Sequence, residues 1–285
     1  MTFAHALRPS LVLLLSAVSA FAAEPAAIAT PARLGSKSWS WESLAIRPTP
    51  VGQRRDVVDR STATLVRFES HVSTLNAGNA SHQPHRHAQE EFIILKEGLL
   101  DVHINGRLTR AHPGAILFFA ANDYHSVTNA GDKPATYLVF NFATAATRTA
   151  PAEGAAAAAL PGKLASQVFP WDQLVAKPTA KGARRDIVNS PTVTCANLSG
   201  HVTTIRAGEM PHAAHRHPDE ELVIVKDGTI EATVNGVVTR GDPGSIFFFG
   251  SNDEHGLKNV GDTDATYYVF RVVTEATPKP PAKKS

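Results

Sequence analysis

The feature that most constrains the fold of this 285-residue chain is an internal repeat. Residues 41–140 align without a gap with residues 171–270, at a constant offset of 130 positions, and about 45 of the roughly 100 aligned pairs are identical. A duplicated unit of this size predicts two copies of one domain. The chain is long enough for each copy to have an apolar core of its own.

Each copy consists of short stretches that are apolar or alternate between apolar and polar residues, and Gly, Pro and Asn residues interrupt them. This pattern is typical of strands joined by tight turns. The pairs Asn105-Gly106 and Asn235-Gly236 indicate hairpins. No long stretch has the periodicity of a helix. The sequence therefore predicts an all-β protein with two domains.

Each copy also contains two histidines separated by one residue, with a glutamate four positions further on: His85, His87 and Glu91, and His215, His217 and Glu221. Side chains alternate between the two faces of a strand, so in an extended chain all three members of a set project to the same side. We therefore expect two imidazoles and one carboxylate to converge in each domain.

A third histidine follows in each copy, after a Pro-Gly turn, a hydrophobic stretch and an Asn-Asp turn. These residues are His125 and His255. Neutral imidazole nitrogens with one carboxylate oxygen are ligands that suit divalent transition metals and leave coordination positions open. Because the whole set occurs twice, the sequence indicates two metal sites.

These residues resemble the two motifs of the cupin family. The first motif is His-x-His, three or four residues, Glu, six residues and Gly, and the second is a Pro-Gly turn, a strand, His, three residues and Asn. The glycines and asparagines that complete the match are Gly98, Gly228, Asn129 and Asn259. The resemblance implies a bicupin, with two tandem germin-like jelly-roll β-barrels and one divalent metal in each. Mn or Fe is the expected ion, and Ni, Co, Cu and Zn are also compatible with the ligands.

The amino-terminal segment predicts secretion. Arg8, the apolar stretch from Leu11 to Leu15 and the small residues before a cut after Ala22 are typical of a signal peptide, and the apolar stretch is too short for a stable membrane anchor. We therefore expect a periplasmic or secreted protein. The expected organisation is a signal peptide at 1–22, a first barrel at 36–142, an Ala/Pro-rich linker at 143–165, a second barrel at 166–273 and a flexible tail at 274–285.

Charge and cysteine content exclude other functions. Without the signal peptide the chain has 27 basic residues (28 minus Arg8) and 26 acidic residues, so nothing favours binding to nucleic acid. Cys195 is the only cysteine, which excludes an intrachain disulfide. It lies in a Thr/Val-rich segment and aligns with Leu65, which predicts a buried thiol rather than a nucleophile.

Four further residues are candidates for substrate binding because each occurs at the same place in both copies: Arg54, Arg184, His71 and His201. An arginine that points into the barrel can bind a carboxylate with two hydrogen bonds, and a histidine there can transfer protons. Each also has a structural interpretation, as an arginine paired with Asp56 or Asp186 between strands, or as a hydrogen-bonded histidine. The aligned pair Tyr124 and Glu254 suggests that the two pockets differ.

Two functions remain open at this point. The first is a metalloenzyme of the dioxygenase or decarboxylase type, an oxidoreductase or lyase that acts on a small organic acid, a phenolic compound or a sugar derivative. The alternative is a bicupin that binds a metal or a small ligand, or has a structural role, without catalysis. Either can form a homo-oligomer, and in either the partner is a small molecule.

Overall fold

The computed structural model describes Met1 and residues 32–149 and 160–279. The signal peptide predicted at residues 1–22 lies outside the described residues, apart from Met1, and so do parts of the predicted linker and tail. No helix in the described segments is long and apolar enough to cross a membrane.

The described chain is almost entirely β-structure, as predicted, and each repeat supplies ten strands. The strands of the first repeat are β1 (Lys37–Trp39), β2 (Arg47–Thr49), β3 (Gly52–Arg60), β4 (Arg67–Leu75), β5 (Glu90–Glu97), β6 (Leu100–Ile104), β7 (Arg107–Ala111), β8 (Ile116–Phe119), β9 (His125–Asn129) and β10 (Ala135–Ala143). Those of the second are β11 (Gln167–Phe169), β12 (Lys177–Thr179), β13 (Gly182–Ser190), β14 (Asn197–Ile205), β15 (Glu220–Asp227), β16 (Ile230–Val234), β17 (Val237–Gly241), β18 (Ile246–Phe249), β19 (His255–Asn259) and β20 (Ala265–Val273). Short 3-10 helices lie at Trp41–Ser43, Ala145–Thr149 and Trp171–Gln173.

Each domain is built from a seven-stranded and a three-stranded sheet, an arrangement consistent with a jelly roll although the sheets do not close into a barrel. In the first domain the strand orders are β11-β8-β5-β10-β4-β3-β2 and β7-β6-β9, and in the second they are β1-β18-β15-β20-β14-β13-β12 and β17-β16-β19. The predicted Asn-Gly hairpins are confirmed, since they join β6 to β7 and β16 to β17. Both asparagines have φ of 47°, as this tight turn requires.

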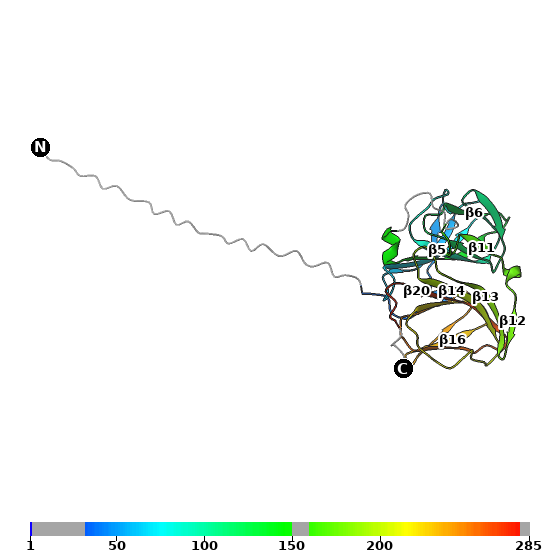
Figure 1. Ribbon diagram of the computed structural model, residues 1–285. Helices are drawn as coiled ribbons and strands as arrows, with labels where there is room; N and C mark the ends of the chain where they lie inside the picture. The colour runs from blue at the N-terminus through cyan, green and yellow to red at the C-terminus, as the bar shows by residue number, and fades with distance from the viewer. Residues whose placement is uncertain (2–31, 150–159, 280–285) are drawn as a thin grey trace. The chain divides into compact units, whose positions relative to one another are not determined.

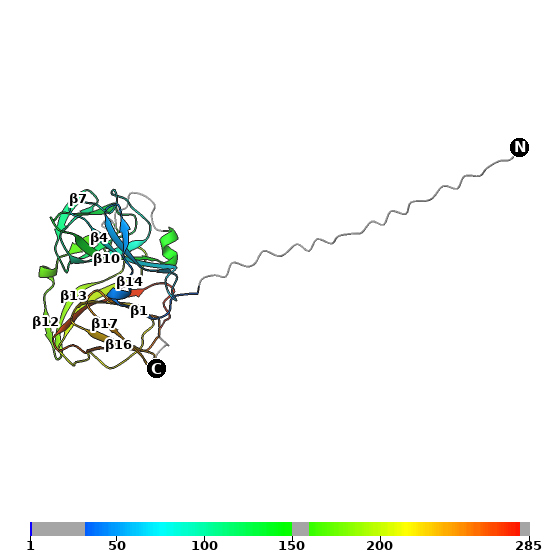
Figure 2. The same cartoon turned by 180° about the vertical axis from the view of Figure 1, so that it is seen from behind.

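The first strand of each repeat belongs to the sheet of the other domain. Strand β1 pairs with β18 of the second repeat, and β11 pairs with β8 of the first. In Figure 1, β11 lies in the half of the molecule that contains β5 and β6, and in Figure 2, β1 lies in the half that contains β16 and β17. The sequence-based boundaries placed residues 37–39 in the first domain and residues 167–169 in the second, and the structure exchanges these two segments.

Successive side chains of the central strands belong to two different hydrophobic cores. In β5, Phe92 and Ile94 pack in a large cluster to which both domains contribute, whereas Ile93 and Leu95 face the interior of their own domain. Strand β15 alternates in the same way between the shared core and the interior of the second domain. Because both faces are buried, the middle of each strand is a continuous apolar run, Phe92 to Leu95 in β5 and Leu222 to Val225 in β15. Glu91 therefore shares its face with Ile93 and points into the domain, while Glu90 points to the shared core.

Glu90 and Glu220 tie the two domains together in the shared core. Glu90 is fully buried, and its carboxylate accepts hydrogen bonds from Thr192 Oγ1 (2.5 Å), Thr194 Oγ1 (2.7 Å) and the backbone N of Val193 (2.9 Å). Glu220 makes the equivalent contacts with Thr62, Ala63 and Thr64 of the first domain. Each carboxylate thus replaces lost water contacts with donors from the other domain.

One residue near the end of the predicted linker and the first residue of the predicted tail are buried. Leu164 is buried, and its N–H donates to the carbonyl of Pro191. Thr274 is also buried, and its hydroxyl donates to the carbonyl of Thr64. These two residues therefore belong to the packed part of the structure.

Candidate metal centres

The segment that carries the first two histidines is not the continuous strand that the sequence analysis assumed. The chain around His85 and His87 is irregular, and strand β5 begins only at Glu90. An isolated antiparallel bridge instead joins His85 to His125, the first residue of β9, through hydrogen bonds of 3.1 and 2.9 Å between their backbones. The side chains converge because of this bridge, and strand parity was the wrong reason for expecting it.

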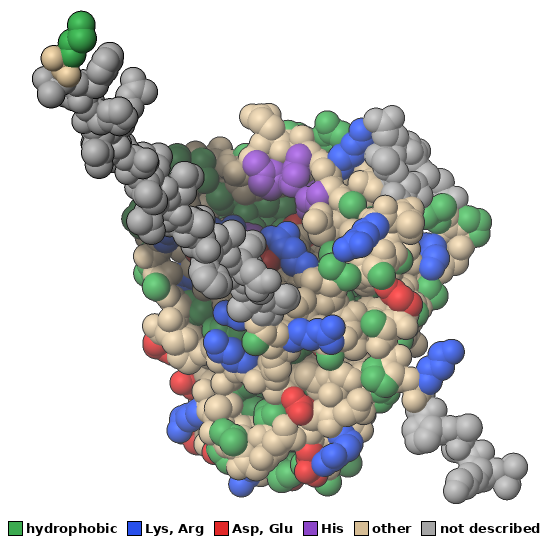
Figure 3. All heavy atoms as spheres, turned by 90° about the vertical axis from the view of Figure 1, so that its left-hand side faces the viewer, with side chains coloured by type: hydrophobic (Ala, Val, Ile, Leu, Met, Phe, Trp, Pro, Cys, Tyr) green, Lys and Arg blue, Asp and Glu red, His purple; other side chains and the backbone are tan. Residues whose placement is uncertain are grey.

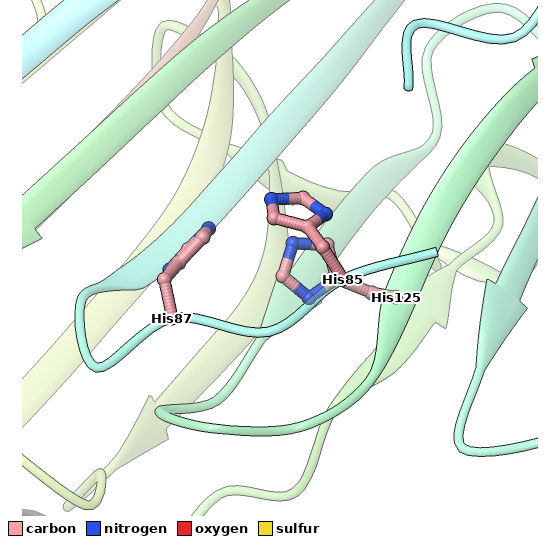
Figure 4. A group of neighbouring side chains, drawn as sticks. All are labelled: His85, His87 and His125. Atoms are coloured by element: carbon pink, nitrogen blue, oxygen red, sulfur yellow. The ribbon is translucent and has the colours of Figure 1, made fainter. Parts of the chain in front are cut away.

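The three histidines of the first domain form a compact cluster. Ligand nitrogens of His85, His87 and His125 all lie within 4.8 Å of one another. Figure 4 shows their rings gathered around one point between the loop and the strands. Glu91 lies beside them, with its Oε2 3.5 Å from Nε2 of His87. This separation suits donor atoms that share one ion.

Backbone carbonyls fix the orientation of two of these rings. His87 Nδ1 lies 2.9 Å from the carbonyl oxygen of Gln89, and His125 Nδ1 lies 2.9 Å from that of Asp123. When Nδ1 carries the proton and donates it to a carbonyl, Nε2 keeps its lone pair for a metal. His125 Nε2 is buried and has no hydrogen-bond partner among the described residues. An ion would supply the interaction that this buried nitrogen lacks.

Burial controls the protonation of the first cluster. Burial, together with the neighbouring imidazoles, lowers the pKa of His85 to about 4. Burial also lowers the pKa of His125. Although burial opposes both effects, the contact between His87 and Glu91 raises the pKa of His87 and lowers that of Glu91. Neutral His85 and His125 and an ionised Glu91 are thus favoured, as metal ligation requires, whereas His87 would have to give up its proton to an ion.

The second domain repeats this geometry. Ligand nitrogens of His215, His217 and His255 form the second cluster, again within 4.8 Å. Glu221 Oε2 lies 3.3 Å from Nε2 of His217, and its Oε1 lies 3.8 Å from Nε2 of His255. Carbonyls two residues away again accept from Nδ1 of His217 (2.8 Å) and His255 (2.9 Å). The chain therefore contains two His-rich sites capable of binding a divalent metal, one in each domain.

The first cluster lies in the wall of one cavity, and His215 and His255 of the second cluster lie in the wall of another. The candidate substrate residues line the same cavities. The first cavity has a volume of about 570 Å³ and includes Arg54 and His71, and the second has about 440 Å³ and includes Arg184 and His201. Figure 3 shows histidine side chains beside a hollow in one face of the molecule, with basic side chains nearby. The arginines also pair with the strand neighbours expected from sequence, Arg54 with Asp56 and Arg184 with Asp186.

A buried acid that the sequence analysis missed organises the wall of the first cavity. Glu69 accepts hydrogen bonds from Arg54 Nη2 (2.9 Å) and Asn141 Nδ2 (3.0 Å), and its Oε1 lies 2.8 Å from Nδ1 of His71. Burial acts to raise the pKa of Glu69, but the contacts with His71 and Asn141 hold it below the ordinary value. His71 is therefore held by a carboxylate at the edge of the cavity.

The second cavity has a different arrangement of charge. Ser199 aligns with Glu69, so His201 lacks this carboxylate partner, and burial together with the charge of Arg184 lowers its pKa to about 4. Instead, Arg271 forms two hydrogen bonds with Asp219, one of them 2.8 Å long.

Asp219 in turn lies beside a predicted metal ligand. Its Oδ1 is 3.4 Å from Nδ1 of His217. Although burial acts in the opposite direction, the contacts with Asp219 and Glu221 raise the pKa of His217 to about 9.

The signal for these differences was present in the repeat itself. The aligned positions Glu69/Ser199, Gln89/Asp219 and Asn141/Arg271 differ while the histidine sets are identical. Comparison of the two copies residue by residue, continued one position beyond residues 140 and 270, would have found all three pairs.

Other histidines and arginines of the two motifs lie at the edge of the sites. The ring of His82 packs edge-on against that of His85, with centroids 3.9 Å apart, and His212 packs against His215 in the same way. Arg86 lies over the ring of Tyr124, and Arg216 pairs with Glu254 at the surface. In these contacts each arginine meets the residue that precedes the third histidine of its domain.

Comparisons with known proteins support the fold. The cupin domain family matches residues 71–141 and 201–271. None of the curated protein sequences matches the chain.

Among solved structures, an oxalate decarboxylase from Lactobacillus farciminis in complex with formate is 16% identical with a TM-score of 0.62, covering 85% of this chain and 88% of its own. A mutant of the Bacillus subtilis oxalate decarboxylase is 15% identical with a TM-score of 0.62 and coverages of 86% and 79%. The Ylba protein of E. coli is 13% identical with a TM-score of 0.63 and coverages of 84% and 90%. At these identities the likeness concerns the fold. With a cupin domain in each repeat and a histidine cluster in each domain, the chain belongs to the cupin family and is a bicupin.

Proposed function

We propose that this bicupin is a metal-dependent enzyme, an oxidoreductase or lyase, that acts on a small oxygen-rich organic acid. The observation that carries the proposal is the orientation of the imidazoles, since His125 and His255 each present a buried, unpaired Nε2 to their cluster. Most buried polar atoms in folded proteins have a hydrogen-bond partner, and a bound ion would supply the missing interaction to both nitrogens at once. The cavity beside each cluster leaves space for a substrate.

The ligands in this proposal are the three histidines and the glutamate of each domain. Imidazole and carboxylate donors fit Mn and Fe best among common biological ions, and Ni, Co, Cu and Zn are also compatible. A bound ion would supply Lewis acidity for the oxygen atoms of a chelating acid. The Phe119 and Phe249 rings stack on His125 and His255, with centroids 4.3 and 4.4 Å apart, and exclude water from that side of the sites.

The side chains of the first cavity can bind and protonate such an acid. Arg54 is held by Glu69 and Asp56 and offers its guanidinium to a carboxylate. His71, oriented by Glu69, can hold a proton beside the cavity and give it to, or take it from, a bound substrate. His201 has no such carboxylate and remains neutral at neutral pH. We therefore assign proton transfer to the first domain.

A small carboxylic acid is also the substrate type that the fold neighbours suggest. The solved oxalate decarboxylases that resemble this chain act on a small dicarboxylate, as their names state. The basic residues that line both cavities, Arg54 and Arg67 in the first and Lys181, Arg184 and Arg271 in the second, favour anionic ligands. We also propose that the protein acts in the periplasm or outside the cell, on the basis of residues 1–22.

The test is turnover by metal-loaded protein. The protein is loaded with Mn²⁺ or Fe²⁺ and supplied with oxalate and other small carboxylic and hydroxy acids, while CO₂ release and O₂ uptake are measured. We expect turnover that His87→Ala abolishes and that Glu69→Gln lowers at least tenfold without loss of metal. His217→Ala is the matched control in the second domain. Loaded protein without turnover of any acid would refute the enzyme assignment and leave a metal-binding role.

A further inference from the structure

Ser166 connects the exchanged segment of the second repeat to the metal centre of the first domain. It lies immediately before β11, which pairs with β8. Its hydroxyl accepts a hydrogen bond from the backbone N of Ala120 (2.8 Å) and donates one to Oδ2 of Asp123 (2.5 Å). Ser166 is therefore bonded to both sides of the turn between β8 and β9.

That turn carries the third histidine of the first domain. Asp123 is 2% exposed, and its backbone carbonyl is the oxygen that lies 2.9 Å from Nδ1 of His125. The orientation of the imidazole, and thus the direction of its Nε2, depends on where this carbonyl lies. Ser166 binds the side chain of Asp123, and the backbone carbonyl of Asp123 binds His125. Asp123 therefore connects a residue of the second repeat to a metal ligand of the first domain.

The first repeat makes the reciprocal contact in the second domain. Ser36 lies immediately before β1, and its hydroxyl accepts from the backbone N of Gly250 (2.8 Å) and donates to Oδ2 of Asp253 (2.5 Å). The carbonyl of Asp253 lies 2.9 Å from Nδ1 of His255. Asn235 also donates to Oδ1 of Asp253 at 2.9 Å. A serine hydroxyl, a backbone N–H, an aspartate and a histidine are thus connected in the same way in both domains.

The serines are fixed in place by the segments that follow them. Strand β1 pairs with β18, and the ring of Trp41 then packs against Gly244. In the other domain, β11 pairs with β8 and the ring of Trp171 packs against Gly114. Because strand pairing and tryptophan packing fix the backbone next to each serine, its hydroxyl can hold the neighbouring turn in one position.

We propose that Ser36 and Ser166 are positioning residues for the metal ligands of the opposite domain, so that each metal centre is completed by the repeat that does not contain its histidines. This inference rests on the proposed metal binding. Groups that orient a metal ligand commonly contribute about 10-fold to 100-fold in affinity. Because each serine acts through an aspartate, we expect the lower value, about tenfold.

The test compares the two serines in proteins with a single metal site. His217→Ala removes a ligand of the second site and leaves the first, and His87→Ala does the reverse. Ser166→Ala and Ser36→Ala are each added to both backgrounds, and Co²⁺ binding is followed by its visible absorption spectrum in a titration. In the His217→Ala background, Ser166→Ala should weaken Co²⁺ binding about tenfold and Ser36→Ala should leave it unchanged. In the His87→Ala background the two effects should be exchanged.

The matched design separates positioning from general destabilisation. If both serine variants weaken the same site equally, or if neither weakens the site of the opposite domain, the inference is wrong. Asp123→Asn, which keeps the backbone carbonyl but weakens the bond to Ser166, should reproduce the effect of Ser166→Ala in the His217→Ala background. If both single-site parent proteins fail to bind Co²⁺, the proposed function itself fails, and this result is distinct from a failure of the serine variants alone.

Discussion

Removing the carboxylate of Glu90 should destabilise the contact between the two domains strongly. In Glu90→Ala, the hydroxyls of Thr192 and Thr194 and the backbone N of Val193 lose the acceptor that they share in the wild-type protein. These donors are buried in the shared core, where water cannot replace the lost partner without opening the interface. Leaving a buried donor without a partner typically costs about 1 to 3 kcal/mol, so the loss of an acceptor that three donors share should cost about 3 to 5 kcal/mol.

Calorimetry gives the most direct assay of this change. A loss of that size should lower the midpoint of thermal unfolding by roughly 10 °C in a chain of this length. Glu97→Ala is the matched control, because Glu97 lies on the same strand with a side chain that is 58% exposed, and its loss should cost less than about 0.5 kcal/mol. If Glu90→Ala is no less stable than Glu97→Ala, the carboxylate does not hold the domains together.

The same residue predicts a pH dependence. Burial raises the pKa of Glu90, although the hydrogen bonds from Thr192 and Thr194 oppose the shift. The folded protein therefore holds this proton more tightly than the unfolded chain does. The contribution of this proton to the free energy of unfolding is fully present below the pKa that Glu90 has in the unfolded chain. It is lost as the pH rises through the pKa that Glu90 has in the folded protein. Glu90→Gln should lack this loss, so the difference in unfolding midpoint between wild type and Glu90→Gln should shift in favour of the variant as the pH rises from acidic to neutral.

Two further predictions concern the buried thiol of Cys195 and the packing of Trp41 against Gly244 of the other domain. Burial raises the pKa of Cys195 far above its ordinary value, so the native protein should not react with a thiol reagent that modifies the denatured chain fully, and rapid native labelling would contradict the burial. Gly244→Ala should cost about 1 to 3 kcal/mol more than Gly236→Ala, because both residues have positive φ but only a methyl group at Gly244 would meet the ring of Trp41, at 2.4 Å. Equal unfolding midpoints for the two variants would show that Trp41 moves aside freely.

Much of the fold could be predicted because the same pattern of strands and turns occurs in both copies of the repeat. Short strands, Asn-Gly turns and a constant offset were sufficient for two all-β domains, and the resemblance of the histidine motifs to those of cupins supplied the type of fold. The exchange of β1 and β11 could not be predicted. Strands β8 and β18, with which they pair, are equivalent in the two repeats, so the sequence does not show which of the two Lys37–Trp39 joins. Only the three-dimensional path of the chain decides between the two.

The candidate site was predicted more completely in its histidines than in its surroundings. Their side chains converge as expected, but through the bridge between His85 and His125 rather than through one strand. Glu69 escaped notice because a single glutamate in an alternating strand has the pattern of a solvent-exposed residue. Its role depends on its cross-strand neighbour Asn141, which lies more than seventy positions away.

The central claim, that each domain holds a metal through its histidine cluster, is tested most directly by elemental analysis of protein purified without exposure to chelators. The account predicts close to two equivalents of a divalent transition metal per chain, and close to one in His87→Ala and in His217→Ala. Protein that contains no metal and takes up none when supplied with Mn²⁺, Fe²⁺ or Co²⁺ would contradict it.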